Sequence, residues 1–285
     1  KFFTPRPKVD WPAHSAMSSH DALMVASGIT TVLDAVAIGD VRDGGDRLEN
    51  LEKMINAVEE TQKRGLNRAE HRLHLRCELP HHTTLPLFEK LVNREPVSLV
   101  SLMDHSPGQR QFANREKYRE YYQGKYSLTD AQMREYEEEQ LALAARWSQP
   151  NRTAIAGMCR ERQIALASHD DATHDHVVES HLLGSVIAEF PTTFEAAESS
   201  RRHGMNVLMG APNIVRGGSH SGNVAAHQLA SLGLLDILSS DYYPASLLDA
   251  AFRVADDENN AFTLAQAINL VTQNPARALN LHDRG

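Results

Sequence analysis

Short apolar runs alternate along this chain with longer amphipathic segments. Seven runs of apolar and often β-branched residues predict strands, and they begin near residues 28, 73, 97, 164, 186, 206 and 235. The segment 46–65 is typical of the intervening stretches, because Leu51, Ile55 and Val58 share one helical face and Gly65 can end the helix. Strands that alternate with helices in this way indicate parallel βα units and an α/β fold.

The number of strands favours a TIM-like (β/α)8 barrel. Seven predicted strands are one short of a closed eight-stranded barrel, and the missing first strand would lie before Lys1. The chain has no initiator methionine and stops at Gly285, soon after a helical segment. We therefore expect residues 1–285 to form one barrel domain that is a fragment of a longer protein.

The segment 115–147 interrupts the alternation of strands and helices. It is dense in Tyr, Glu, Gln and Arg, and residues 129–132 fit a capping box at the start of a helix. We expect a helical insertion here. A lid over a substrate and a solvent-exposed helical hairpin would both have this composition.

Four of the apolar runs end at a side chain that can bind a metal ion or accept a proton, namely Glu78, His105, His169 and Asp241. The carboxyl ends of parallel strands share one face of an α/β fold, so we expect these side chains to converge on one pocket. Two imidazoles and two carboxylates suit a hydrolytic Zn, Mn or Fe site. Asp241 would be both ligand and general base, and Asp170 or Asp171 could hold the second ring nitrogen of His169. Alone, each residue is also explained by packing or by helix capping.

A glycine pair after the predicted strand near residue 206 suggests an anion-binding loop. Gly217 and Gly218 would let backbone N–H groups approach a phosphate closely, although a flexible turn would have the same sequence. The side chains expected to add contacts to a phosphorylated sugar are Arg216, Ser219, His220, Arg110 and Tyr242.

Composition narrows the classes of partner. The formal net charge of −8 argues against a nucleic-acid partner. No apolar run reaches the length of a membrane span, so no membrane partner is expected. The chain has only two cysteines, which favours a cytoplasmic location. An unpaired sheet edge in this fragment would permit a homo-oligomer.

These segments together resemble the amidohydrolase superfamily, whose barrels carry metal ligands at strand ends. Residues 28–34 are similar to its second strand, and residues 271–281 are similar to its last helix. Within that superfamily, nearly the whole chain resembles the diphosphatases of the carbon–phosphorus lyase pathway. The motifs that carry this likeness lie at residues 3–7, 103–109, 167–171, 188–193, 210–213, 216–223 and 239–244.

The resemblance implies metal-dependent hydrolysis of a ribose 5-triphosphate during phosphonate breakdown, with release of pyrophosphate. It implies divalent metal ions, expected to number two in the longer protein, and a triphosphate held by Arg216 and the glycine pair. The superfamily's first-strand His-x-Asp/His motif and its small β-sandwich would lie outside this chain. Counting strands places Glu78 and His169 one strand earlier than is usual in the superfamily, so Glu189 is a further candidate ligand.

Two other functions are compatible with the same fold. A relative acting on a C–N bond, such as a deaminase or cyclic amidase, would have a pocket poor in anion-binding groups, and Arg216 argues against it. An inactive fragment that only binds a phosphorylated ligand is favoured by the missing first strand and opposed by the four later ligands.

Overall fold

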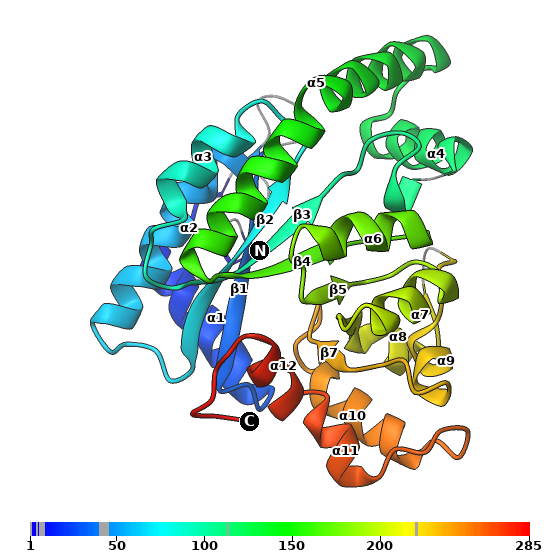
Figure 1. The fold of residues 1–285 in the computed structure, drawn as a ribbon. Coiled ribbons are helices and arrows are strands. Elements are labelled where there is room, and N and C mark those ends of the chain that lie inside the picture. The colour runs from blue at the N-terminus through cyan, green and yellow to red at the C-terminus, as the bar shows by residue number, and fades with distance from the viewer. Residues whose placement is uncertain (1, 4, 6–8, 40–45, 113, 220–221) are drawn as a thin grey trace.

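Seven parallel strands form one sheet whose spatial order follows the sequence. The computed structural model describes residues 2–3, 5, 9–39, 46–112, 114–219 and 222–285, with the backbone alone for 46–50. The strands are β1 (Thr31–Ile38), β2 (Glu70–Glu78), β3 (Val97–Met103), β4 (Ala165–His169), β5 (Ile187–Glu189), β6 (Asn206–Gly210) and β7 (Ile237–Ser239). The sheet curls into a half-barrel (Figure 1). All seven predicted strands and the α/β class are confirmed. The closed eight-stranded barrel stays a prediction.

Helices fill the segments between strands and flank the sheet (Figure 1). The longer ones are α1 (Ala13–Ala26), α2 (Asp46–Lys63), α3 (Thr84–Leu91), α4 (Arg115–Tyr126), α5 (Asp130–Arg162), α6 (His174–Leu182), α7 (Phe194–Arg202) and α10 (Ser246–Asp256). The shorter ones are α8 (Ala211–Arg216), α9 (Ala226–Ser231), α11 (Leu264–Asn269) and α12 (Gln273–Ala278). None of the helices in the described ranges combines the length and apolar character that a bilayer crossing requires.

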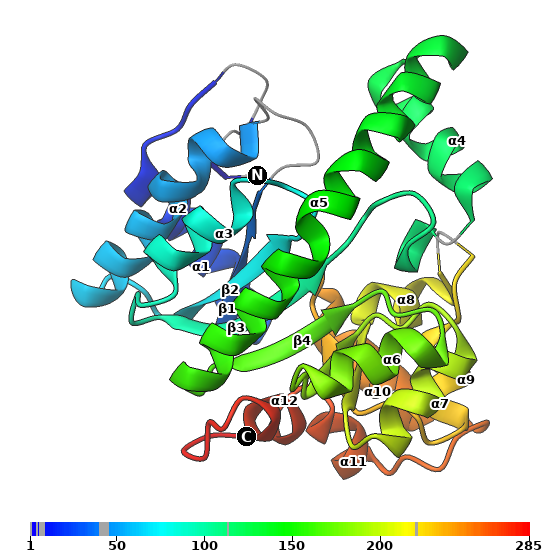
Figure 2. The same cartoon turned by 45° about the horizontal axis from the view of Figure 1, so that its top comes forward.

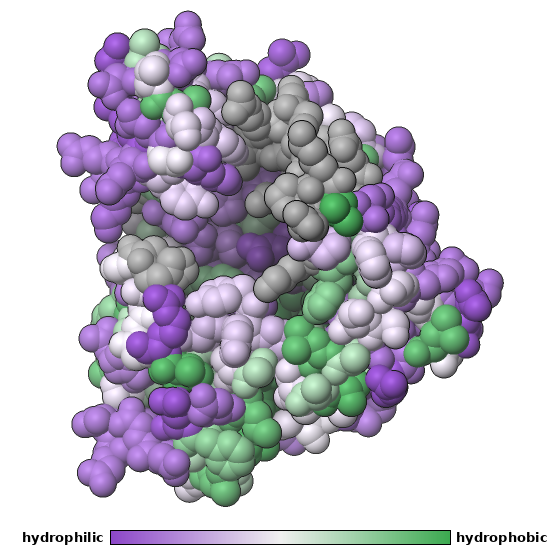
Figure 3. All heavy atoms as spheres, turned by 180° about the vertical axis from the view of Figure 1, so that it is seen from behind, coloured by the Kyte–Doolittle hydropathy of each residue, from purple (hydrophilic) through white to green (hydrophobic). Residues whose placement is uncertain are grey.

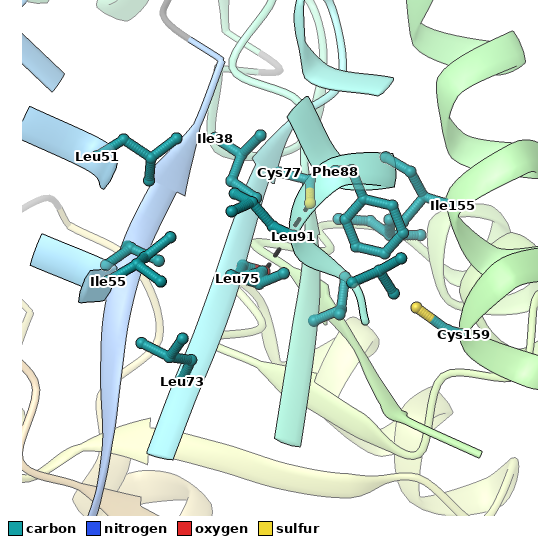
Figure 4. Close-up of a cluster of buried hydrophobic side chains, with 14 of the residues drawn as sticks. Ile38, Leu51, Ile55, Leu73, Leu75, Cys77, Phe88, Leu91, Ile155 and Cys159 are labelled. Carbon is teal, nitrogen blue, oxygen red and sulfur yellow. Dashed lines mark hydrogen bonds between the residues drawn. The ribbon is translucent and has the colours of Figure 1, made fainter. Parts of the chain in front are cut away.

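Side chains along β2 point alternately to the two faces of the sheet, as the period of a strand requires. Leu73, Leu75 and Cys77 face outward and are fully buried in the largest hydrophobic core. Figure 4 shows this core, in which side chains from α2, α3 and α5 pack against the outward residues of β1 and β2. Arg76 and Glu78 face the other way and line a cavity.

The inward face of the sheet changes from apolar to polar toward the carboxyl ends of the strands. Its apolar layer is formed by one buried residue from each of five strands, Leu99, Ala167, Ile187, Leu208 and Ile237. The next inward position on four of these strands, two residues further along, is Ser101, His169, Glu189 and Gly210. The apolar layer therefore closes the base of a polar site above it.

Helices α4 and α5 form a hairpin that projects away from the sheet (Figures 1 and 2). Tyr118, Tyr122 and Tyr136 form a buried aromatic cluster between the two helices. The helical character predicted for residues 115–147 is confirmed. Helix α5 continues through Pro150 to Arg162, and its second half packs into the core of the sheet.

Truncation of a core side chain should destabilise the whole domain. Phe88 is 0% exposed in the core beside β2, so Phe88→Ala is expected to lower the free energy of unfolding by about 3–5 kcal/mol, because it removes buried apolar area and leaves a cavity. Phe252 on α10 is 45% exposed, and Phe252→Ala should cost about 1 kcal/mol or less. Denaturant unfolding of both variants measures the difference, and equal losses would contradict the placement of this core.

Candidate active site

A cavity of about 490 Å³ lies at the carboxyl ends of the strands. Glu78, His105, His169 and Asp241, the four side chains expected to converge, all line it. Seen from behind, the molecule has a hollow whose surface is hydrophilic (Figure 3). The structure therefore brings these four residues into one polar site.

His105 is held by a buried carboxylate. Its Nδ1 lies 2.9 Å from both carboxylate oxygens of Glu78, which is 3% exposed. A carboxylate only accepts hydrogen bonds, so Nδ1 carries the proton and Nε2 faces Asp170, whose Oδ2 is 3.9 Å away. Burial lowers the pKa of His105, but attraction to Glu78 outweighs it and leaves the pKa above its ordinary value.

His169 is held in the same way by Glu189. The two residues are register partners on β4 and β5, and His169 Nδ1 lies 2.8 Å from Glu189 Oε2. Ser101 Oγ donates to the same oxygen at 2.8 Å. Burial would raise the pKa of Glu189, but the nearby His169 outweighs it and the pKa lies well below its ordinary value. The sequence suggested that Asp170 or Asp171 could hold one ring nitrogen of His169. Glu189 holds Nδ1, and Asp170 lies near Nε2.

Asp170 and Arg76 complete the group around the two imidazoles. Asp170 Oδ2 lies 3.3 Å from His169 Nε2, and one ligand atom from each of His105, His169 and Asp170 falls within 4.8 Å of the others. Arg76 Nη2 donates to His169 Nε2 at 3.1 Å. Sequence reasoning missed Arg76, although its position two residues before Glu78 places it on the same face of β2.

Asp241 lies at the mouth of the cavity, where its position depends on a glycine. Its side chain is exposed, and the residue has a φ of 50° in the loop after β7. A Cβ added at Gly210, at the end of β6, would come within 2.9 Å of Asp241 Oδ2. Only glycine at position 210 leaves the carboxylate in place.

The glycine pair follows α8 and borders the same cavity. Gly217 and Gly218 have φ angles of 80° and 155°, which glycine adopts readily. Gly218 lines the cavity together with Arg216, Ser219 and Tyr242, and Arg216 Nη1 donates to the Tyr242 hydroxyl at 3.4 Å. The predicted contact from His220 lies outside the described residues.

Arg110 lies away from the cavity and is engaged elsewhere. It is 2% exposed and forms ion pairs with Asp171 and, at 3.0 Å, with Glu179. Arg152 pairs with the same Glu179 at 2.9 Å and with Asp104 at 3.3 Å. Burial and the neighbouring Arg152 lower the pKa of Arg110 to about 10. Its guanidinium pairs with the buried Asp171 and the partly exposed Glu179, so the phosphate contact predicted for Arg110 would require these ion pairs to break.

The chain is similar to known hydrolases. The chain is 90% identical over 285 residues to the Escherichia coli (strain K12) alpha-D-ribose 1-methylphosphonate 5-triphosphate diphosphatase, covering all of this chain and 75% of that protein. An uncharacterized metal-dependent hydrolase from Pyrococcus horikoshii OT3 has a crystal structure with a TM-score of 0.55 and 13% identity, covering 96% of this chain and 56% of that one. The second similarity concerns the fold alone. No protein-family model matches the chain. The 90% identity to the E. coli protein over the whole chain shows that this chain belongs to the alpha-D-ribose 1-methylphosphonate 5-triphosphate diphosphatase family.

Proposed function

We propose that the protein hydrolyses alpha-D-ribose 1-methylphosphonate 5-triphosphate to the 5-phosphate and pyrophosphate, with the help of a divalent cation. The observation that carries this proposal is one cavity that combines the paired imidazoles with Arg216 and the glycine loop. The name of the E. coli relative supplies the substrate. Hydrolysis of the bond between the first and second phosphoryl groups consumes one water. The first phosphoryl group stays on the ribose as the 5-phosphate, and the other two leave together as pyrophosphate.

The described residues fit a divalent cation such as Zn, Mn or Fe. Buried carboxylates hold Nδ1 of both His105 and His169, so Nε2 of each ring could serve as a ligand, and Asp170 adds a carboxylate nearby. At His169 a cation would have to replace the hydrogen bond that Nε2 accepts from Arg76. In this assignment Glu78 and Glu189 orient the two imidazoles. A cation held there would supply Lewis-acid stabilisation of phosphoryl oxygens and would make a water more acidic.

Asp241 is the proposed general base. Its carboxylate lines the cavity and is exposed to solvent, so a water can reach it. It would take the proton of the water that attacks phosphorus. Gly210 leaves room for the carboxylate at this place.

The proposed phosphate-binding side of the cavity is positively charged. Arg216 and the N–H groups of the glycine loop would neutralise the triphosphate. Lys117 of α4 reaches the same loop, because its Nζ lies 3.8 Å from the place that a Cβ of Gly222 would occupy. Tyr242 would position the ribose, since its exposed ring stands beside Arg216.

Removal of the proposed base should abolish turnover without unfolding the protein. Asp241→Asn in the full-length, metal-loaded protein is expected to lower kcat by about 10²–10⁴-fold, because an amide cannot accept the proton. Pyrophosphate release measures the loss. Asp249→Asn on the exposed side of α10 is the control and should retain wild-type turnover. Full activity in Asp241→Asn would contradict the assignment of the base, and no turnover by the folded wild type would refute the proposed substrate.

A methyl group at Gly210 should act through Asp241. The Cβ of Gly210→Ala would meet the carboxylate at 2.9 Å, and displacement by a fraction of an ångström to 1 Å is expected to lower kcat by up to about 10²-fold. Gly157→Ala is the matched control, because a Cβ at Gly157 would meet nothing within 4 Å. Steady-state kinetics of the two variants, at equal fold content by circular dichroism, makes the comparison. Equal kcat values would show that Gly210 does not position the base.

Loss of the guanidinium at Arg216 should weaken binding of the triphosphate. Arg216→Ala is expected to lower kcat/KM by about 10–100-fold, the value of a charged hydrogen bond to phosphate. It should weaken inhibition by added pyrophosphate by a similar factor. Arg253→Ala, which removes a surface ion pair on α10, is the control for the loss of one positive charge. Unchanged inhibition by pyrophosphate would place the leaving group elsewhere.

A further inference from the structure

A second group of imidazoles and carboxylates lies on the opposite face of the sheet from the cavity. His20 comes from α1, Asp34 from β1 and His71 from β2. Asp34 and His71 occupy outward positions, because Val36 and Leu73, two residues further along each strand, belong to the core beneath the helices. The sheet itself therefore separates this group from the candidate active site.

The carboxylate of Asp34 stands between the two imidazoles. Its Oδ1 lies 2.6 Å from His20 Nε2, and its Oδ2 lies 2.7 Å from His71 Nδ1. One ligand atom from each of the three side chains lies within 4.8 Å of the other two. Two imidazole nitrogens and a carboxylate oxygen form a donor set that Zn and related divalent metals bind, with a fourth position open to water.

Asp21 fixes the orientation of His71 from its other side. The Asp21 carboxylate accepts the backbone N–H of Arg68 at 3.0 and 3.1 Å and that of Ala69 at 2.9 Å. Its Oδ1 lies 3.2 Å from His71 Nε2. Both ring nitrogens of His71 therefore face carboxylates. A metal beside Asp34 would take the place of the proton on Nδ1, while Nε2 keeps its hydrogen bond to Asp21. Metal-binding histidines commonly have this carboxylate partner on the second nitrogen.

Burial and charge at this group both favour a cation. The side chain of His71 is 0% exposed and that of Asp34 is 11% exposed, while His20 at 25% leaves a path from solvent. A divalent cation bound by these three side chains would balance the charge of the nearly buried Asp34 carboxylate.

We propose that His20, Asp34 and His71 form a second divalent-metal site, of Zn type, that is separate from the catalytic centre. A metal bound there joins α1 to β1 and β2, three elements that the chain brings together only on folding. Its effect is on the stability of the folded state rather than on the phosphoryl chemistry. This inference does not depend on the proposed function.

The test counts metal ions in the full-length protein. Wild type, His20→Gln and His14→Gln are stripped with a chelator and titrated with Co²⁺, and the visible absorption of bound Co²⁺ and the metal content after dialysis are measured. His14 is the matched control, because it lies on the same helix and pairs with exposed Glu60. Asp34→Asn is a second variant of the same site, and circular dichroism establishes that each variant is folded.

We expect wild type and His14→Gln to bind one more Co²⁺ per chain than His20→Gln and Asp34→Asn. The rise in Tm that Co²⁺ produces should also be smaller in those two variants, while kcat at saturating metal is the same in wild type and His20→Gln. Equal Co²⁺ content in wild type and in folded His20→Gln would overturn the proposal. The three side chains would then form only a network of hydrogen bonds. Absence of catalytic turnover in every sample would refute the proposed function without affecting this count.

Discussion

The parallel register between β4 and β5 is the constraint on which the candidate active site depends. It sets His169 opposite Glu189, with both side chains on the inward face. A slip of one residue in either strand would turn that strand's side chain to the helix side and break the pair, because successive side chains of a strand point to opposite faces. The apolar layer just below, which includes Ala167 and Ile187, holds this register by burial. The geometry of the site is thus a consequence of packing beneath it.

Buried pairs of imidazole and carboxylate recur on both faces of the sheet. Glu78 holds His105, Glu189 holds His169, and on the outer face Asp21 holds His71. Each carboxylate decides which ring nitrogen carries a proton, so the other nitrogen has a fixed direction. The pairing also avoids the penalty for a lone buried charge. The protein thus fixes the orientation of these three imidazoles before any ligand binds.

The sequence predicted the fold more completely than it predicted the contacts of individual side chains. Apolar runs located all seven strands. The polar residues that close four of these runs, such as Glu78, indicated a shared cavity, because parallel strands end on one face. Arg110 was assigned to substrate, since a turn sequence does not reveal which side of a loop a guanidinium faces. Asp34 lies 14 residues after His20, and His71 lies 37 residues after Asp34, yet each of these two pairs is in contact. No short motif spans such distances, so tertiary packing alone reveals this group.

The ion pairs of Arg110 bear on how this protein can change over generations. Arg110, Asp171, Arg152 and Asp104 are all buried, and Glu179 joins the two arginines. Replacing one buried partner leaves an uncompensated charge at a cost of about 3–5 kcal/mol, a large share of the ~5–15 kcal/mol that keeps a domain folded. Inherited substitutions here must therefore arrive in compensating combinations. None of these five described residues lines the cavity. Slow divergence at these positions would therefore reflect a requirement for folding, even though catalytic residues diverge equally slowly.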